Sequence, residues 1–169
     1  MKKLLLLLLY IPFLGFTQER VLRKNLTEKF VRFADSKGGY YECYYNENLF
    51  TGTSVSYYKN GQLQEEVSYK NGLKDGLEQR WLTNGQLGEY INYKNGLRHG
   101  LDRRWYIDGQ LEWEENYKNG LLHGFRKKWH ENGQLEVLED YIDGKKISAK
   151  RFDKEGNEKH IPIDGEMNK

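Results

Sequence analysis

Cysteine and proline are scarce in this chain of 169 residues, which has one cysteine and two prolines. A single cysteine, Cys43, excludes a disulfide within the chain, so the fold must be held by packing. Cys43 could join two chains, but a half-buried strand residue is the commoner role. Both prolines, Pro12 and Pro162, lie outside the central region. Every residue of the central region therefore has a backbone N–H that can donate to a neighbouring strand, which favours β-structure.

Long hydrophobic runs are also scarce. The main one, residues 4–14, follows Lys2 and Lys3 and precedes small residues ending at Thr17. This pattern predicts an export signal over residues 1–17, and the absence of a cysteine after it argues against a lipid anchor. The run has about half of the roughly 20 residues that cross a bilayer, so a permanent anchor is the weaker interpretation. We expect export to the periplasm, the cell surface or the medium.

A charge excess is missing too. The chain has 27 basic and 25 acidic residues, a formal net charge of +2. Nucleic-acid binding requires a basic surface, and here basic and acidic segments alternate, so we expect no nucleic-acid partner. Aliphatic residues are few, but 4 Trp, 13 Tyr and 7 Phe supply apolar area. These aromatics predict a folded chain with an aromatic core.

A repeat of 24 residues fills the centre of the chain. Four units, residues 46–69, 70–93, 94–117 and 118–141, share glycine, aromatic and tyrosine columns. The glycine columns include Gly76, Gly100 and Gly124, and another column gives Gly-Gln-Leu from Gly61, Gly85, Gly109 and Gly133. A fixed period in this range predicts units that are stabilised by stacking on their neighbours.

Each unit contains two turn signals. In one turn, Asn-Gly or Asp-Gly is followed by Gln-Leu, as at residues 84–87. In the other turn, Asn-Gly is followed directly by Leu, as at residues 71–73. Both dipeptides favour type I′ turns between antiparallel strands, and about eight residues separate the turns. The sequence therefore predicts an all-β fold in which tandem antiparallel hairpins form an elongated, twisted single sheet or open solenoid.

Alternation within the strands predicts two unlike faces. We expect one face to carry aromatic and leucine side chains, with Leu77 and Trp81 beside Ile91 and Tyr93, and the other to carry charge as a solvated surface. The aromatic face is the candidate binding face. Its residues are Tyr57, Trp81, Trp105, Trp113, Trp129, Tyr69, Tyr93, Tyr117 and Tyr141.

The predicted organisation has five parts. A signal peptide (1–17) precedes a degenerate repeat or N-terminal cap (18–45), in which strands flank Ser36-Lys37-Gly38-Gly39. Four hairpin repeats (46–141) follow. A degenerate C-terminal repeat or cap (142–165) is rich in lysine, which discourages pairing between sheet edges. Residues 166–169 form a tail.

These residues resemble a known repeat family. The pattern Tyr-x-Asn-Gly-x-x-x-Gly-x-x-x-x-Trp-x-x-Asn-Gly-Gln-Leu, as at residues 69–87, is similar to the bacterial variant of the MORN repeat found in the YwqK family of toxin–antitoxin antitoxins. The resemblance covers about residues 46–157. It implies a row of β-hairpins that associates with proteins or membranes and carries no catalytic residues. The predicted export signal does not fit an antitoxin that neutralises a cytoplasmic toxin, because such an antitoxin would stay inside the cell.

No residues suggest a metal, a cofactor or catalysis. His99 and His123 occupy equivalent positions, which in adjacent hairpins lie about 10 Å apart, too far for one zinc ion. None of the few serines lies in a nucleophile-elbow motif, and Cys43 has no histidine near it in the sequence. The glutamate pairs recur in every unit, whereas a catalytic pair would normally occur once in a chain. We therefore predict no enzyme, no cofactor and no metal site.

The leading functional hypothesis is an exported module that binds a protein, either an envelope component or an exported toxin. A glycan or cell-surface ligand is the first alternative, because sugars stack on exposed aromatic rings. Attachment to a membrane surface is the second, and near-zero net charge makes it the weakest. The sequence leaves the oligomeric state open.

Overall fold

The computed structural model describes residues 20–32 and 39–159, which are almost entirely β-strand. Apart from the 3₁₀ turn η1 (Arg23–Asn25), no helix occurs in these ranges, and none there could span a membrane. The strands are β1 (Arg20–Leu22), β2 (Thr27–Arg32), β3 (Gly39–Tyr45), β4 (Asn48–Leu49), β5 (Gly52–Tyr57), β6 (Leu63–Lys70), β7 (Leu73–Trp81), β8 (Leu87–Lys94), β9 (Leu97–Trp105), β10 (Leu111–Lys118), β11 (Leu121–Trp129), β12 (Leu135–Ile142), β13 (Lys145–Phe152) and β14 (Glu158–Lys159).

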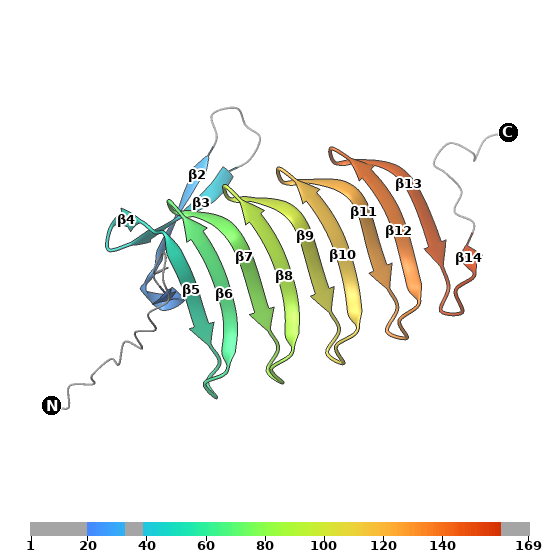
Figure 1. Ribbon diagram of the computed structural model, residues 1–169, viewed down its shortest axis with the longest axis horizontal. Coiled ribbons are helices and arrows are strands. Elements are labelled where there is room, and N and C mark those ends of the chain that lie inside the picture. The colour runs from blue at the N-terminus through green and yellow to red at the C-terminus, as the bar shows by residue number, and fades with distance from the viewer. Residues whose placement is uncertain (1–19, 33–38, 160–169) are drawn as a thin grey trace, which may run out of the picture.

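The repeats form one long sheet. From β5 to β14 every strand pairs with the next in antiparallel fashion, and β1 adds in parallel at the β5 edge, which gives 11 strands in chain order. Figure 1 shows these hairpins side by side in a twisted row whose two ends do not meet. The predicted elongated, open, all-β sheet of tandem hairpins is confirmed, and the sheet is not closed.

The N-terminal segment departs from the row. Its strands β2, β3 and β4 form a separate three-stranded sheet beside the first hairpins (Figure 1). The strands expected on either side of residues 36–39 appear as β2 and β3, and β3 begins at Gly39. Residues 33–38 and the predicted signal peptide lie outside the described residues. Cys43 donates its backbone N–H to the carbonyl of Gly72 at 2.7 Å, which links the two sheets.

The main apolar cluster lies at this junction. Cys43 is buried there with Val21, Phe50, Val67 and Tyr69. The aromatic rings of Phe50 and Tyr69 have centroids 5.8 Å apart. Because Cys43 is enclosed, its role is packing, which is the commoner role of such a cysteine.

The short turns follow the prediction. Asn71, Asn95, Asn119 and Asp143 have φ of 48–52°, and the glycines after them also have positive φ. Positive φ at both central positions defines a type I′ turn, whose twist matches the strands. These dipeptides are therefore required for backbone geometry.

The long turns differ from the type I′ prediction. At residues 82–86 only Gly85 has positive φ; its N–H donates to the carbonyl of Leu82, and the N–H of Leu82 donates to the carbonyl of Gln86. Asn84 instead accepts a bond from the N–H of Gln86 at 3.0 Å through its side chain. Such local bonding is why Asn and Asp favour turns. The same bond recurs at Asn60, Asp108 and Asn132.

Each repeat has two register shifts. The shift near the long turn changes which side chains share a face of the sheet. Across β7 and β8, Glu78 pairs with Ile91 and Leu77 with Asn92, but near the turn Trp81 pairs with Leu87. Gly88 is the extra residue, and a bulge reverses the alternation along the strand. Leu87 therefore shares a face with Trp81, whereas Ile91 lies on the face of Glu78. The prediction that Trp81, Ile91 and Tyr93 share one aromatic face was wrong.

Candidate interaction surfaces

The register divides the candidate aromatics between two surfaces. The surface named here the tryptophan face carries the column Tyr57, Trp81, Trp105 and Trp129, the leucines paired with it, and the column Leu77, Leu101 and Phe125. The opposite surface, the tyrosine face, carries Tyr69, Tyr93, Tyr117, Tyr141 and Trp113. The sequence had placed all nine candidate residues together.

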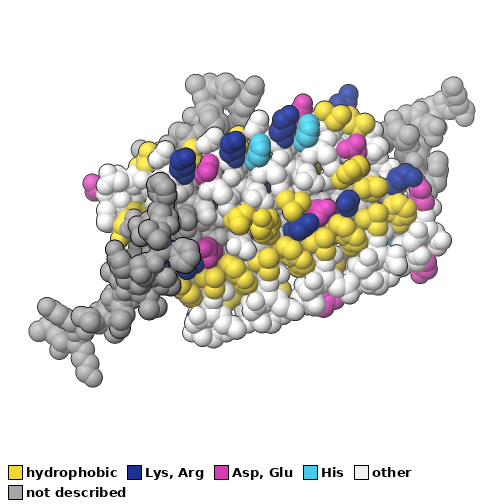
Figure 2. Space-filling view, viewed as in Figure 1, with side chains coloured by type: hydrophobic (Ala, Val, Ile, Leu, Met, Phe, Trp, Pro, Cys, Tyr) yellow, Lys and Arg dark blue, Asp and Glu magenta, His cyan; other side chains and the backbone are white. Residues whose placement is uncertain are grey.

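The tryptophan face is largely apolar. Figure 2 shows hydrophobic side chains in a band that runs along the sheet across successive repeats, interrupted by a few charged side chains. Tyr57 and Phe125 are 50% and 51% exposed, and the three tryptophans are half-buried. Its main charged group is Glu114, which accepts from Arg103 at 2.8 Å and lies 3.4 Å from Lys127.

The tyrosine face is enclosed and charged. Glu78 and Asp102 are only 1% and 2% exposed, although the sheet has a single layer. Side chains of the same face cover them: Lys74 pairs with Glu78 and lies over the Tyr93 ring, and Arg98 pairs with Asp102 and lies over the Tyr117 ring. A long basic side chain thus covers a carboxylate and meets the tyrosine of the following strand.

Ion pairs connect the repeats along this face. Arg80 contacts Glu65 at 2.9 Å, Glu78 at 2.5 Å and Glu89 at 2.6 Å, and Glu89 also contacts Arg104 at 3.1 Å. Further along the sheet, Arg126 joins Glu115 and Glu139, and Glu139 reaches Lys146. These carboxylates are occupied by partners within the protein, so they form a structural network.

The pKa shift of each buried carboxylate depends on how many basic side chains contact it. Burial raises the pKa of Glu65, but hydrogen bonds from Arg80 and Arg23 outweigh this and hold it below its usual value. Asp102 has one close partner, Arg98 at 2.9 Å, and its Oδ2 makes no hydrogen bond of proper geometry to the described residues. Burial therefore dominates and raises the pKa of Asp102 to about 6, against the pull of Arg98 and Arg104.

Trp113 lies within the charged face. The guanidinium of Arg126 is 4.3 Å from its ring centroid and the ammonium of Lys128 is 5.5 Å away. A cation over an indole ring is attracted by the electrons of the ring face. Trp113 is therefore engaged within the tyrosine face, and it does not extend the apolar band as the sequence suggested.

His99 and His123 bond to neighbouring turns. Nδ1 of His99 accepts from the N–H of Asn119 at 3.4 Å, and Nδ1 of His123 accepts from the N–H of Asp143 at 3.4 Å. In the same column Asp75 accepts from Asn95 at 3.0 Å. Over residues 20–32 and 39–159, no group of three or more metal-ligating side chains comes together.

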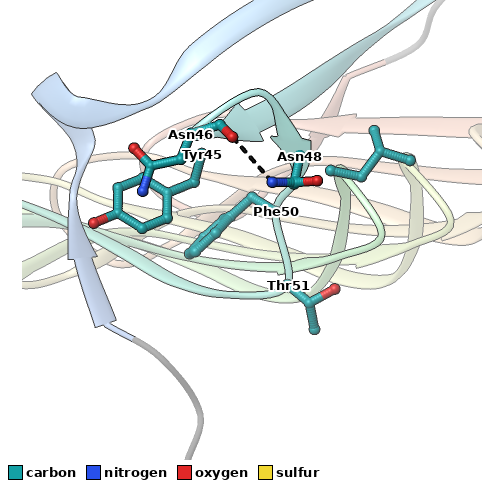
Figure 3. A pocket seen from close by; sticks show the side chains of 6 residues that line it. Tyr45, Asn46, Asn48, Phe50 and Thr51 are labelled. Carbon is teal, nitrogen blue, oxygen red and sulfur yellow. Dashed lines mark hydrogen bonds between the residues drawn. The ribbon is translucent and has the colours of Figure 1, made fainter.

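Shallow hollows lie on the surface of the described residues, and two of them are candidates for a site. One, about 240 Å³, lies at the tip of β4, where Asn48 donates to the carbonyl of Asn46 beside Phe50 (Figure 3). The other, about 320 Å³, lies between Arg80, Leu82, Gly88 and Arg104. Gly88 lines it, at the position where the other repeats carry Gln64, Glu112 and Glu136, and a Cβ added at Gly88 would lie 2.9 Å from Cδ2 of Leu82. Neither hollow brings together a nucleophile and a general base.

The fold and surfaces define a class: an open-sheet repeat protein of β-hairpins with an apolar face and a charged face. Residues 50–71, 74–95 and 122–143 match the MORN repeat variant. The chain therefore contains repeats of the MORN variant type, a kind of repeat that is generally non-catalytic. The intervening hairpin β9–β10 continues the row with the same pairing. Searches of curated proteins and of solved structures found no significant match.

Proposed function

We propose that this chain is an exported, non-enzymatic binding module that holds a partner protein on its tryptophan face. The observation that carries the proposal is the apolar band along one side of a single-layer sheet. Within residues 20–32 and 39–159, no second layer packs over the band between β7 and β12. A contiguous apolar surface of this kind is typical of an interaction site.

The composition of the band suits protein recognition. Tryptophan and tyrosine are the residues most enriched at binding hot spots, because one rigid ring buries a large area. Trp81, Trp105 and Trp129 recur once per hairpin, which presents a regular row to a partner. The ion pairs of Glu114 with Arg103 and Lys127 supply a polar feature that can orient that partner.

The tyrosine face is a poorer candidate. Its carboxylates are paired with arginines and lysines of the same face, and Tyr69 is buried in the N-terminal cluster. Binding there would require those pairs to open. We assign this face to stability and the tryptophan face to binding. Export follows from the predicted signal over residues 1–17, and an exported toxin is the partner that the YwqK resemblance suggests.

Affinity capture tests the proposal. Wild-type protein is used as bait for envelope extract, beside a Trp105→Ala/Trp129→Ala double variant. A Tyr117→Phe variant on the opposite face is the matched control, and circular dichroism verifies that all three are folded. We expect the double variant to lose a protein that wild type and Tyr117→Phe both retain. Equal capture by all three would reject the tryptophan face.

A glycan is the second candidate, favoured by the exposed ring of Tyr57 at the start of the tryptophan column. Sugars stack on such rings, so binding should change tryptophan fluorescence. We would titrate envelope polysaccharides into wild type and into a Tyr57→Ala variant. A saturable change that weakens in the variant supports a glycan, and an unchanged spectrum rejects it.

A further inference from the structure

Within the part of the chain that the structure describes, strand β13 leaves most of its outer edge unpaired. On its inner side it pairs with β12 from Lys145 to Arg151. On its outer side β14 pairs only with Arg151 and Phe152. Figure 1 shows β14 as a short remnant beside the end of β13. Among the described residues, nothing else pairs with the outer edge of residues 145–150, so its outward N–H and C=O groups can accept another strand.

This edge is strongly basic. β13 carries Lys145, Lys146, Lys150 and Arg151 and no acidic residue. Residues 145–151 are all exposed. Within the part of the chain that the structure describes, Lys145 has no ion pair, and Lys150 is bound only to Glu158 of β14, at 3.1 Å. The short segment that does pair with the edge therefore places a carboxylate against a lysine.

The preceding repeats show which strand complements β13. A basic first strand pairs with an acidic second strand: Arg103 of β9 pairs with Glu114 of β10, and Arg126 of β11 pairs with Glu139 of β12. Both register pairs are also ion pairs, at 2.8 Å and 3.0 Å. β13 occupies the position of the first strand in its unit, and β14 supplies only two residues of the second strand.

A second copy of the chain does not fit this edge. Two β13 strands in antiparallel contact would bring lysines against lysines, and like charges on paired strands are destabilising. The edge at the other end of the sheet, β1, is three residues long and carries Arg20. A strand of opposite charge from a different molecule is the complement that suits this edge.

We propose that the open edge of β13 is a second binding site, which takes an extended acidic segment of a partner protein as an additional antiparallel strand. Backbone hydrogen bonds supply the affinity, and the lysines select acidic over neutral or basic strands. The site is separate from the tryptophan face and does not depend on it.

A peptide from the chain itself is the probe. The sequence of residues 135–142, labelled with fluorescein, is titrated with the full-length protein and followed by anisotropy. We expect saturable binding that weakens about tenfold, a loss of about 1.4 kcal/mol, when Glu136, Glu139 and Asp140 are replaced by Gln, Gln and Asn in the peptide. Hydrogen exchange should show new protection at residues 145–150 when the acidic peptide is added.

Two controls separate strand addition from charge attraction. Peptides of unchanged charge that carry N-methyl groups at alternate amides, in both possible phases, cannot complete a ladder, and at least one phase should fail to bind. A Lys145→Gln/Lys150→Gln protein should bind about tenfold more weakly, whereas the Trp105→Ala/Trp129→Ala protein should bind as wild type does. Absence of binding, or equal binding of the neutral and N-methyl peptides, would overturn the site and show that the lysines only protect the edge.

Discussion

The phenol of Tyr106 donates a hydrogen bond of 2.8 Å to the backbone carbonyl of Trp129, 23 positions later. Tyr58 makes the same bond to Trp81 at 2.6 Å, and Nε2 of His130 lies 3.1 Å from the carbonyl of Phe152. Each bond connects one hairpin to the next. Leu82 occupies the equivalent position in the second repeat and cannot make it, and Leu82 lines the larger hollow.

Removing this bond should destabilise the row. Tyr106→Phe keeps the ring and removes the donor, so we expect the free energy of unfolding to fall by about 1 kcal/mol in urea denaturation. The converse change, Leu82→Tyr, places a donor opposite Trp105 where the hollow offers space, and should raise stability. Equal stability of Tyr106→Phe and wild type would show that the bond contributes nothing.

Asp102 should make stability rise as the solution is acidified from neutral pH. Its unfolded pKa is near 3.8 and its folded pKa about 6, so the folded state binds the proton more tightly. The penalty for the buried charge is fully present above pH 6 and is relieved as pH falls toward 4. We expect a gain on the order of 1 kcal/mol between pH 7.5 and pH 5 that is absent in Asp102→Asn.

Further acidification should reverse the gain. Glu65, Glu114 and Glu139 have pKa values held below the usual range, because hydrogen bonds from arginine and lysine outweigh the effect of burial. Their contribution is present above the unfolded pKa, near 4.5, and is lost as pH falls through the folded values. Stability should therefore peak near pH 5. Monotonic loss from pH 7.5 downward would contradict this account of Asp102.

Two glycines with similar backbone angles should respond differently to alanine. A Cβ added at Gly61 (φ 86°) would have nothing within 4 Å, whereas a Cβ added at Gly72 (φ 77°) would lie 2.6 Å from Cδ2 of Leu49 and 3.1 Å from the backbone carbonyl oxygen of Cys43. Gly61→Ala carries only backbone strain, about 1 kcal/mol. Gly72→Ala adds steric overlap beside the core and should cost about 2 kcal/mol more. Equal melting temperatures for the two variants would refute the close contact.

The position that His99 and His123 occupy in their repeats should tolerate another side chain that accepts a hydrogen bond. His99→Ala removes the acceptor for the N–H of Asn119, and we expect a loss of about 0.5 to 1 kcal/mol. His99→Asp supplies a carboxylate, as Asp75 does for Asn95, and should keep most of the stability. Thermal melts of both variants test this. If His99→Asp were as unstable as His99→Ala, the bond to the turn would not explain the column.

The row of hairpins could be predicted from the sequence because its signals are local. Asn-Gly forms a type I′ turn at Asn71, Asn95 and Asn119, and a period of 24 fixes the neighbours of each strand. The open sheet follows from these two facts. The role of Asp108 in the long turn is equally local, yet Asp-Gly fits two turn types and the sequence does not distinguish them.

The division of the faces could not be predicted in the same way. It depends on the extra residue at Gly88, because one residue in a strand moves every following side chain to the other face. Strict alternation from Trp81 through the turn therefore misplaced Ile91 and Tyr93. The burial of Glu78 could not be predicted either, because it depends on Lys74 and on Tyr93 of the adjacent strand, and their placement follows from the same register.

The most direct test of this arrangement is a methyl nuclear Overhauser measurement on Ile91. Ile91 pairs with Glu78 and lies on the tyrosine face, while Leu77 points to the tryptophan face. We predict cross-peaks from the δ1 methyl of Ile91 to the side-chain protons of Glu78 and none to the methyls of Leu77. Strong cross-peaks between Ile91 and Leu77, with none to Glu78, would contradict the two-faced sheet and the binding surface assigned to it.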